Sequence, residues 1–361
     1  MPVFEFSGPG DLAAWMRDAG SDAGVVLSSR VRLSRNLRTH PYPGTCSAEE
    51  DLRLREEILE AIRHLPNAGE FAILYLDELA PLERRILFER GLIGQAFSLE
   101  KQRALALADN AGLAAVACEE DHLRLAALGA GSCLERLLGR VDALDDALAA
   151  SLPFAVSREW GYLNTAVGNL GTGMRASLML HLPALAMSGL LAKAMKATAQ
   201  IGVSIRGFFG EASESLGDLY LVANELTIGQ GGREFAAALG RVAAQLSAWE
   251  TRTREELAAR RRMDLEDRVF RALGLLTHCR YLTMREAVDT LASLRLGVAL
   301  GMVDRPGLSE LTALLYLVRK AHVQHLAAGR HDTADVRQID WTRARMVRQA
   351  VAGAAPGGGG G

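Results

Sequence analysis

The spacing of apolar residues predicts a mixture of helices and strands in the first two thirds of the chain. The tetrapeptide Ser47 to Glu50 (SAEE) has the form of a capping box. In a capping box the serine side chain accepts from the amide of the glutamate, and the glutamate side chain accepts from the amide of the serine. A charged amphipathic helix is therefore expected to run to about His64. The apolar runs at 71–76 and 112–118 are short enough to be buried strands, and the second delivers its last residues to the edge of a sheet.

The pattern becomes wholly helical after residue 232. Residues 234–276 predict one long, charge-laced helix or two, and Thr283 to Glu286 (TMRE) forms a second capping box. Short helices are expected from there to Gln349. We therefore expect a boundary near residue 262, which divides the chain into three parts: a mixed α/β domain at 1–262, a helical domain at 263–352 and a disordered Gly-rich tail at 353–361.

Composition and charge narrow the classes of function. The 361 residues include 41 basic and 43 acidic side chains, and this balance provides no global field for nucleic acid, so a polyanion would need a local cluster of arginines. The sequence has no signal-peptide pattern, and no apolar run reaches the roughly 18 residues of a membrane helix. The four cysteines show neither a CxxC pair nor metal-ligand spacing. We expect a cytoplasmic protein that contacts neither membranes nor nucleic acid directly.

Two glycine- or arginine-bearing segments could bind an anion. Arg30 and Arg32 lie two residues apart in an extended segment (SSRVRLSR), so both guanidinium groups face one side and can grip phosphate oxygens. Such a pair is, taken alone, more often a plain surface feature. Gly171 and Gly173 (GTGMRA) permit close approach of an anion to the backbone, and this segment is expected to open a helix whose first amides favour negative charge.

An acidic cluster follows the predicted strand at 112–118. Its three consecutive carboxylates, residues 119–121, repel one another, and a fold rarely tolerates this unless a cation lies beside them. The alternative is an ordinary polar loop. His122 follows the acidic cluster and is expected to support it. The segment at 205–214 adds one more arginine and carboxylate beside glycines.

Together these segments predict phosphoryl transfer to a basic acceptor, because arginines suit a polyphosphate and carboxylates suit a cation. The candidate residues are five arginines (Arg30, Arg32, Arg124, Arg175, Arg206) and two separated carboxylates (Glu120, Glu211). The chain contains no Walker loop and no HRD or DFG motif, which disfavours the common kinase folds.

Five ordered motifs give the chain a resemblance to a known family. They are VVLSSRVRLSRNL at 25–37, EEDHLRL at 119–125, GYLNTAVGNLGTGMRASLMLHLPAL at 161–185, IRGFFGEASESLGDLYLVANELTIGQ at 205–230 and LEDRVFRALGLL at 265–276. On these motifs the chain resembles the phosphagen (guanidino) kinase superfamily and, within it, the bacterial protein-arginine kinases of the McsB type. The resemblance implies an α+β fold: a guanidino-kinase catalytic domain with an antiparallel-rich sheet flanked by helices, followed by an all-α C-terminal domain.

The resemblance also implies roles for the candidate residues, with ATP and Mg²⁺ as cofactors. The five arginines would bind the phosphates of ATP. Glu120 would orient the substrate guanidinium and act as general base, with Glu211 as its partner on a flexible loop. Glu119 and Asp121 would lie near the water shell of the magnesium, with no direct protein ligand to the metal. This chemistry is reasonable because a guanidinium, with a pKa above about 12, becomes a nucleophile only when a carboxylate aligns it and takes its proton.

Three positions depart from the family pattern. Ala166 stands where the family usually has an active-site cysteine, which removes one anion beside the substrate. Cys118 replaces the asparagine of the NEEDH motif, and we expect it to be a small buried residue. In the end domain the RDxxRA motif of a phosphoarginine pocket is reduced to Asp340 and Arg343, because Ile339 replaces its first arginine.

The favoured hypothesis is an active protein-arginine kinase that marks proteins for a Clp-type AAA+ unfoldase and protease, or inactivates a heat-shock repressor. The resemblance implies as partners protein substrates with an exposed arginine, these two proteins, a zinc-binding activator protein and a second copy of the chain in a homodimer. One alternative is a weakened or inactive adaptor that binds nucleotide or phosphoarginine, which Ala166 motivates. The other is a kinase for a small guanidino compound. It is disfavoured because such kinases carry a helical domain ahead of the RxR motif that has no counterpart here.

Overall fold

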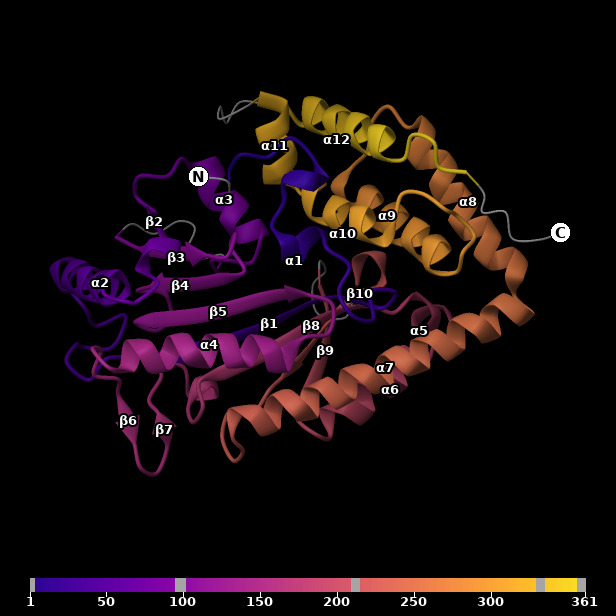
Figure 1. The fold of residues 1–361 in the computed structure, drawn as a ribbon. Coiled ribbons are helices and arrows are strands. Elements are labelled where there is room, and N and C mark those ends of the chain that lie inside the picture. The colour runs from indigo at the N-terminus through magenta and orange to yellow at the C-terminus, as the bar shows by residue number, and fades with distance from the viewer. Residues whose placement is uncertain (1–3, 95–101, 209–214, 329–334, 356–361) are drawn as a thin grey trace.

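The computed structural model describes residues 4–94, 102–208, 215–328 and 335–355. Its centre is an eight-stranded sheet in the order β2-β3-β4-β5-β1-β8-β10-β9, with helices on both faces (Figure 1). Every neighbouring pair in this sheet is antiparallel. The predicted α+β class, with an antiparallel sheet and a helical C-terminal region, is confirmed.

The strands are β1 (Val26–Arg35), β2 (Ala72–Tyr75), β3 (Ala104–Ala108), β4 (Leu113–Ala117), β5 (Leu123–Ala130), β8 (Met174–His181), β9 (Val203–Gly207) and β10 (Leu219–Asn224), together with a small separate hairpin of β6 (Val156–Ser157) and β7 (Gly161–Tyr162). The α-helices are α1 (Ala14–Arg17), α2 (Ala48–Arg63), α3 (Pro81–Glu89), α4 (Leu134–Ala149), α5 (Pro183–Met187), α6 (Leu191–Ala199), α7 (Gly232–Arg260), α8 (Arg262–His278), α9 (Met284–Ala299), α10 (Leu308–Leu317), α11 (Lys320–Ala328) and α12 (Val336–Ala350).

Local signals fixed several of these elements. The capping box of α2 is present, since Ser47 Oγ accepts from the amide of Glu50 at 3.3 Å and the Glu50 carboxylate accepts from the amide of Ser47 at 2.7 Å. At the start of α9, Thr283 Oγ1 accepts from the amide of Glu286 at 3.2 Å. The apolar runs at 71–76 and 112–118 contain β2 and β4, so both predicted strands are confirmed.

The structure decides the conformation of two segments, the charged stretch at 234–276 and the glycine-bearing segment at 171–176. The charged stretch at 234–276 is two helices, because Arg261 between α7 and α8 leaves helical geometry (φ −135°, ψ 41°). The expectation that GTGMRA opens a helix is wrong: the segment leads into β8, which pairs with β1 on one side and β10 on the other. Gly173 has φ +63°, and a Cβ there would lie 2.5 Å from the carbonyl oxygen of Ser34. Its glycine therefore lets the turn approach β1.

Each face of the sheet carries its own apolar layer. Val31 and Leu33 of β1 join a layer covered by α2, α4 and α7. The opposite layer holds α1, α3 and the helices of the C-terminal region, and its core is continuous from the sheet into α9 and α10. The C-terminal helices thus pack directly on the sheet, with Tyr316 at the end of α10 among the buried residues. This arrangement brings Tyr316, at the end of α10, close to Ser28 of strand β1.

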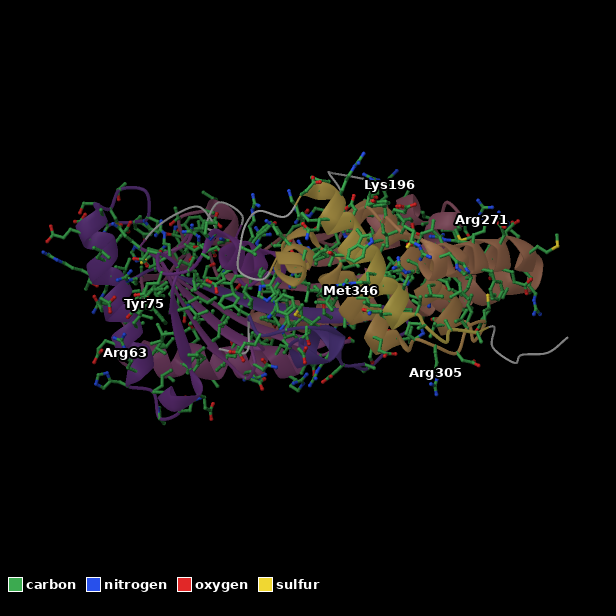
Figure 2. The ribbon with its side chains drawn as sticks, turned by 90° about the horizontal axis from the view of Figure 1, so that it is seen from above. Arg63, Tyr75, Lys196, Arg271, Arg305 and Met346 are labelled. Carbon is green, nitrogen blue, oxygen red and sulfur yellow. The ribbon has the colours of Figure 1, made fainter. Side chains whose placement is uncertain are left out.

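Some charged side chains extend from the periphery of the molecule. Seen from above, Arg63, Arg271 and Arg305 extend away from the body of the molecule (Figure 2). In the described part of the chain, no helix combines the length and the apolar character needed to cross a bilayer.

Candidate active site

Alternation along β1 places Arg30, Arg32 and Ser34 on one face of the sheet, as the RxR spacing predicts. Directly opposed residues of paired antiparallel strands point to the same face. Arg175 of β8 lies opposite Arg32, and Arg124 of β5 lies opposite Ser34. Three strands, β1, β5 and β8, therefore deliver side chains to one patch of the sheet.

A cavity of about 320 Å³ lies over this patch. The structure brings to it all the predicted site residues of the catalytic half that it describes: Arg30, Arg32, Arg124, Arg175, Arg206, Glu119, Glu120, Asp121 and also Ala166. The predicted Glu211 lies outside the described residues. Segments separated by up to 176 positions, from Arg30 to Arg206, thus meet at one site.

The guanidinium groups in this cavity crowd one another. The pKa of Arg32 is well below its usual range, chiefly because of the neighbouring charge of Arg30 and then because of burial. Burial first, and Arg124 second, lower the pKa of Arg30 to about 10. Among the described residues, neither Arg30 nor Arg32 forms an ion pair with a carboxylate. A bound polyanion would relieve this repulsion.

Glu119 and Arg124 hold each other in place. The Glu119 carboxylate pairs with Arg124 through one oxygen and accepts from the amide of Gly94 at 2.7 Å through the other. Arg124 also donates to the carbonyl oxygen of Leu92 at 2.9 Å. In the described contacts Glu119 therefore positions a phosphate-binding candidate, and its place near a magnesium water shell stays a prediction.

Asp121 joins three segments beneath the cavity. Its Oδ1 accepts from Asn36 Nδ2 at 2.9 Å and from the amide of Thr165 at 2.7 Å. Asp121 also lines the cavity, and its Oδ2 is buried and has no hydrogen-bond partner among the described residues. A buried carboxylate oxygen of this kind needs a donor. His122 supports the same turn, since its Nδ1 accepts from the amide of Leu37 at 2.9 Å.

Glu120 differs from its two acidic neighbours because it is exposed within the cavity. It is therefore the carboxylate of the turn that can meet an incoming cation. Cys118, just before it, is 1% exposed, and burial raises the pKa of its thiol to about 12, so it is a neutral buried residue as predicted. Its backbone is left-handed (φ +61°), a conformation that asparagine adopts more readily than cysteine.

Two asparagines that the sequence analysis missed hold Arg175. Asn169 Oδ1 accepts from Arg175 Nε at 3.2 Å, and the carbonyl oxygen of Asn224 accepts from Nη1 at 3.4 Å. The Asn224 side chain also bridges β8 and β10, since its Oδ1 accepts from the amide of Ala176 at 2.7 Å and its Nδ2 donates to Met174 O at 3.1 Å. An asparagine at the end of a strand was the available signal.

A second cavity, of about 210 Å³, adjoins the first and shares Arg30, Ser177 and Leu221 with it. Its sheet-side lining includes the apolar residues Met179 and Leu128. The sequence analysis did not predict this cavity, because its walls come from parts of the chain that only the fold brings together.

Asp340 and Arg343 of α12 form an ion pair, but they do not line either cavity. Arg343 is buried and donates to the carbonyl oxygens of Val318 and Leu282, each at 2.7 Å. These bonds tie α12 to the end of α10 and to the segment before α9. A phosphoarginine pocket at these residues stays a prediction.

Five converging guanidinium groups beside an exposed carboxylate, on an antiparallel sheet, define a phosphoryl-transfer enzyme for a cationic acceptor. Comparison with families of known proteins supports the same class of enzyme. The catalytic-domain model of the ATP:guanido phosphotransferases matches residues 53–253, and the model of the protein-arginine kinase McsB C-terminal domain matches residues 262–357.

The chain belongs to the protein-arginine kinase family. It is 37% identical to the protein-arginine kinase of Moorella thermoacetica over 343 residues, which cover 94% of this chain and 97% of the relative. It is 35% identical to that of Halothermothrix orenii, with 94% and 96% of the two chains covered. The family predicted from the motifs is thereby confirmed.

Solved structures support the fold alone. A lombricine kinase crystal structure superposes with a TM-score of 0.57 at 22% identity and covers 68% of this chain and 70% of its own. The duplicated taurocyamine kinase of Schistosoma mansoni superposes with a TM-score of 0.58 at 21% identity over 73% of this chain and 38% of its own.

Proposed function

We propose that this chain transfers the γ-phosphoryl group of ATP to arginine side chains of proteins. The observation that carries the proposal is the meeting of five guanidinium groups and the exposed Glu120 in one cavity of about 320 Å³. Phosphoryl transfer needs positive charge around the phosphates and a group that positions the acceptor, and this cavity supplies both.

The two adjoining cavities suggest how the substrates lie. Because Arg30 lines both, the triphosphate would lie over the arginines and the nucleoside would enter the more apolar cavity beside Met179. The acceptor arginine would then occupy the part of the first cavity that Glu120 and Ala166 line. This order places the γ-phosphoryl group between the arginines and Glu120.

In the proposed step, a terminal nitrogen of the acceptor guanidinium attacks the γ-phosphorus, and the bond from phosphorus to the β–γ bridging oxygen breaks. ADP leaves with that oxygen. Glu120 holds the guanidinium in line and takes the proton that the nitrogen loses as the N–P bond forms. Glu211 would hold the other side of the guanidinium. Arg30, Arg32, Arg124, Arg175 and Arg206 stabilise the charge on the transferring group.

The residues present fit a magnesium ion carried in by ATP. Among the described residues there is no group of three His, Cys, Asp or Glu side chains that could hold a metal, so the ion would depend on phosphate oxygens and water. The unpartnered Oδ2 of Asp121, and Glu119 beside it, would accept from such waters. When bound, Mg²⁺ neutralises charge on the β- and γ-phosphates.

Membership of the family supports a wider setting as part of the proposal. The phosphorylated proteins would be passed to a Clp-type AAA+ unfoldase, or would include a heat-shock repressor inactivated by the modification. A zinc-binding activator protein, a homodimer, a phosphoarginine pocket at Asp340 and Arg343 and a cytoplasmic location belong to the same proposal.

Ala166 favours a second candidate function. It lines the cavity where the family usually carries a thiol, so the chain could serve as an adaptor that binds nucleotide without turnover. The adaptor function requires that the wild-type chain transfers no phosphoryl group from ATP. Competition with free arginine separates the remaining alternative, a kinase for a small guanidino compound, from a protein kinase.

The test is transfer of ³²P from ATP to an arginine-rich protein such as casein, with mass spectrometry to locate acid-labile phosphate on arginine. We expect Glu120→Gln to lower the rate by about 10²–10⁴-fold, because it removes the base and one partner of the guanidinium. Glu78→Gln, at an exposed glutamate outside the cavity, is the matched control and should retain the rate. Absence of phosphoarginine, or an unchanged rate in Glu120→Gln, would contradict the proposal.

A further inference from the structure

The second cavity is closed by the helical C-terminal region. Its floor is the sheet, one side comes from Trp15 of α1, and another comes from the end of α3 at Glu89. A further wall is formed by Tyr316, at the end of α10, and Arg319, just before α11, and Phe208 after β9 also lines the cavity. A cavity that adjoins the phosphate-binding arginines therefore contains residues from both halves of the chain.

Tyr316 is fixed in this wall by contacts to the catalytic half. It is 4% exposed, and its ring packs edge-on against Trp15 with the ring centroids 5.4 Å apart. Its hydroxyl oxygen lies 3.5 Å from Ser28 Oγ, on the same face of β1 as Arg30 two residues further on. Burial raises the pKa of Tyr316, so the phenol is neutral. An uncharged aromatic ring thus lies next to the arginine cluster.

The surrounding contacts hold the helical region against α3. The Glu89 carboxylate accepts from the amide of Ala321 at 2.9 Å and from His322 Nδ1 at 2.8 Å, which caps the start of α11. Arg319 donates to the carbonyl oxygen of Glu89. These bonds fix the position of Tyr316 relative to Arg30.

We propose that Tyr316 is a positioning residue for the nucleoside of ATP, so that the helical region completes the nucleotide site. The inference rests on the proposed function, which places the triphosphate over Arg30 and its neighbours. Planar bases stack favourably on aromatic rings, and the cavity that Tyr316 lines is the apolar one next to the phosphate site. A nucleotide that touches both halves binds best when the helical region is docked, so ATP stabilises that docking.

The experiment compares ATP with inorganic tripolyphosphate, both with Mg²⁺, by isothermal titration calorimetry on the full chain. The affinity for tripolyphosphate depends on the arginines alone, whereas the affinity for ATP depends on the arginines and on the second cavity, where the nucleoside would bind. For Tyr316→Leu we expect ATP affinity to fall about tenfold while tripolyphosphate affinity stays within about twofold, because only stacking of the base is lost. Tyr316→Phe keeps the ring and should keep ATP affinity within about threefold.

Tyr281→Leu is the matched control, since this tyrosine belongs to the same helical region but is 60% exposed and lines neither cavity. Equal losses for ATP and tripolyphosphate in Tyr316→Leu would overturn the inference, because they would mean that Tyr316 acts only through the arginines. Unchanged ATP affinity would overturn it as well. If Tyr316→Leu fails to fold, a large loss of ATP affinity in Tyr316→Phe would also contradict a role for the ring.

Failure of the proposed function gives a different result. A wild-type chain that binds ATP through Tyr316 but phosphorylates no arginine would overturn the proposed function and leave this inference standing. A wild-type chain that binds neither ATP nor tripolyphosphate would overturn both.

Discussion

Arginines serve this molecule in two contrasting ways. In the catalytic cavity, Arg30 and Arg32 lie side by side, and neither forms an ion pair with a carboxylate among the described residues. Under the sheet, Arg254 of α7 pairs with the fully buried Glu250 at 2.6 Å and donates to the carbonyl oxygen of His181 at 3.1 Å. The residue type is the same, but Arg30 and Arg32 are half-buried whereas Arg254 is buried, and the available acceptors differ.

This difference shows what an arginine needs in order to become part of a site. Glu250 is also fully engaged, because it accepts from the amides of Ala184 and Leu185, each at 3.0 Å, at the start of α5. That network has no capacity left for a ligand. The catalytic arginines have the opposite property: their mutual repulsion destabilises the ligand-free protein and is offset when an anion binds.

The largest effect on stability is expected from Arg254→Met. The substitution leaves Glu250 as an uncompensated buried charge, so the free energy of unfolding should fall by about 3–5 kcal/mol. Urea denaturation followed by circular dichroism measures it. The double variant Arg254→Met/Glu250→Leu should recover part of the loss, because it removes the unpaired charge but leaves the amides of Ala184 and Leu185 without their acceptor. A single variant as stable as wild type would contradict the contrast between the two groups of arginines.

Arg32→Met should have the opposite sign. Removing one of the crowded charges leaves no carboxylate unpaired, so the ligand-free protein should be as stable as wild type or more stable. Its affinity for ATP should nevertheless fall by about 10-fold to 100-fold, since one charge-assisted contact of roughly 1.5–3 kcal/mol is lost. Urea denaturation and calorimetric titration of the same preparation test both parts. A variant destabilised as much as Arg254→Met would show that the two groups of arginines are equivalent.

A third kind of arginine environment predicts a dependence on pH. Arg90 Nε donates to His322 Nε2 at 3.2 Å, and burial first, then Arg90 and Arg319, lower the pKa of His322 to about 4 despite the opposing Glu89. The unfolded chain binds this proton below about pH 6.5 and the folded chain only near pH 4. The free energy of unfolding should therefore fall as pH drops from about 6.5 to about 4, by at most about 1.4 kcal/mol per unit.

Denaturation midpoints across that range measure the effect of His322. In His322→Gln the slope should become shallower, whereas His64→Gln, at an exposed histidine, should leave it unchanged. Equal slopes for wild type and His322→Gln would contradict a neutral, buried His322.

The smallest effect is expected from Ala166→Cys. The substitution restores the family's thiol beside the acceptor but changes none of the arginine contacts, so the rate of arginine phosphorylation should change by less than about tenfold, or about 1.4 kcal/mol. Steady-state kinetics with ATP and casein measure it. If Ala166→Cys creates activity where wild type has none, the adaptor function would replace the kinase.

The sequence predicted those features that depend on local rules. The two-residue spacing of Arg30 and Arg32 indicated a shared face, and the capping box at Ser47 indicated the start of α2, because both depend on neighbours in the chain. The roles of the site residues came from resemblance to a family. The structure adds that five arginines and Glu120 lie in one cavity.

Features set by distant contacts could not be predicted in this way. The segment at Gly171 looked like the start of a helix, but pairing with β1 and β10 decides in favour of a strand. Tyr316 carried no signal, since it meets Ser28 across 288 positions of sequence. Asn224 was missed for a similar reason, because its partners lie on β8.

The segment before β1 has a consequence for how the enzyme is made. The carbonyl oxygen of Gly24 accepts from Arg254 at 3.0 Å and from Arg295 at 3.2 Å. The strand that bears Arg30 is synthesised early, yet these two anchors emerge from the ribosome more than two hundred residues later. A chain whose synthesis stops before α9 therefore carries the phosphate-binding arginines on a strand without its full support. Completion of translation thus becomes a condition for a fully supported site.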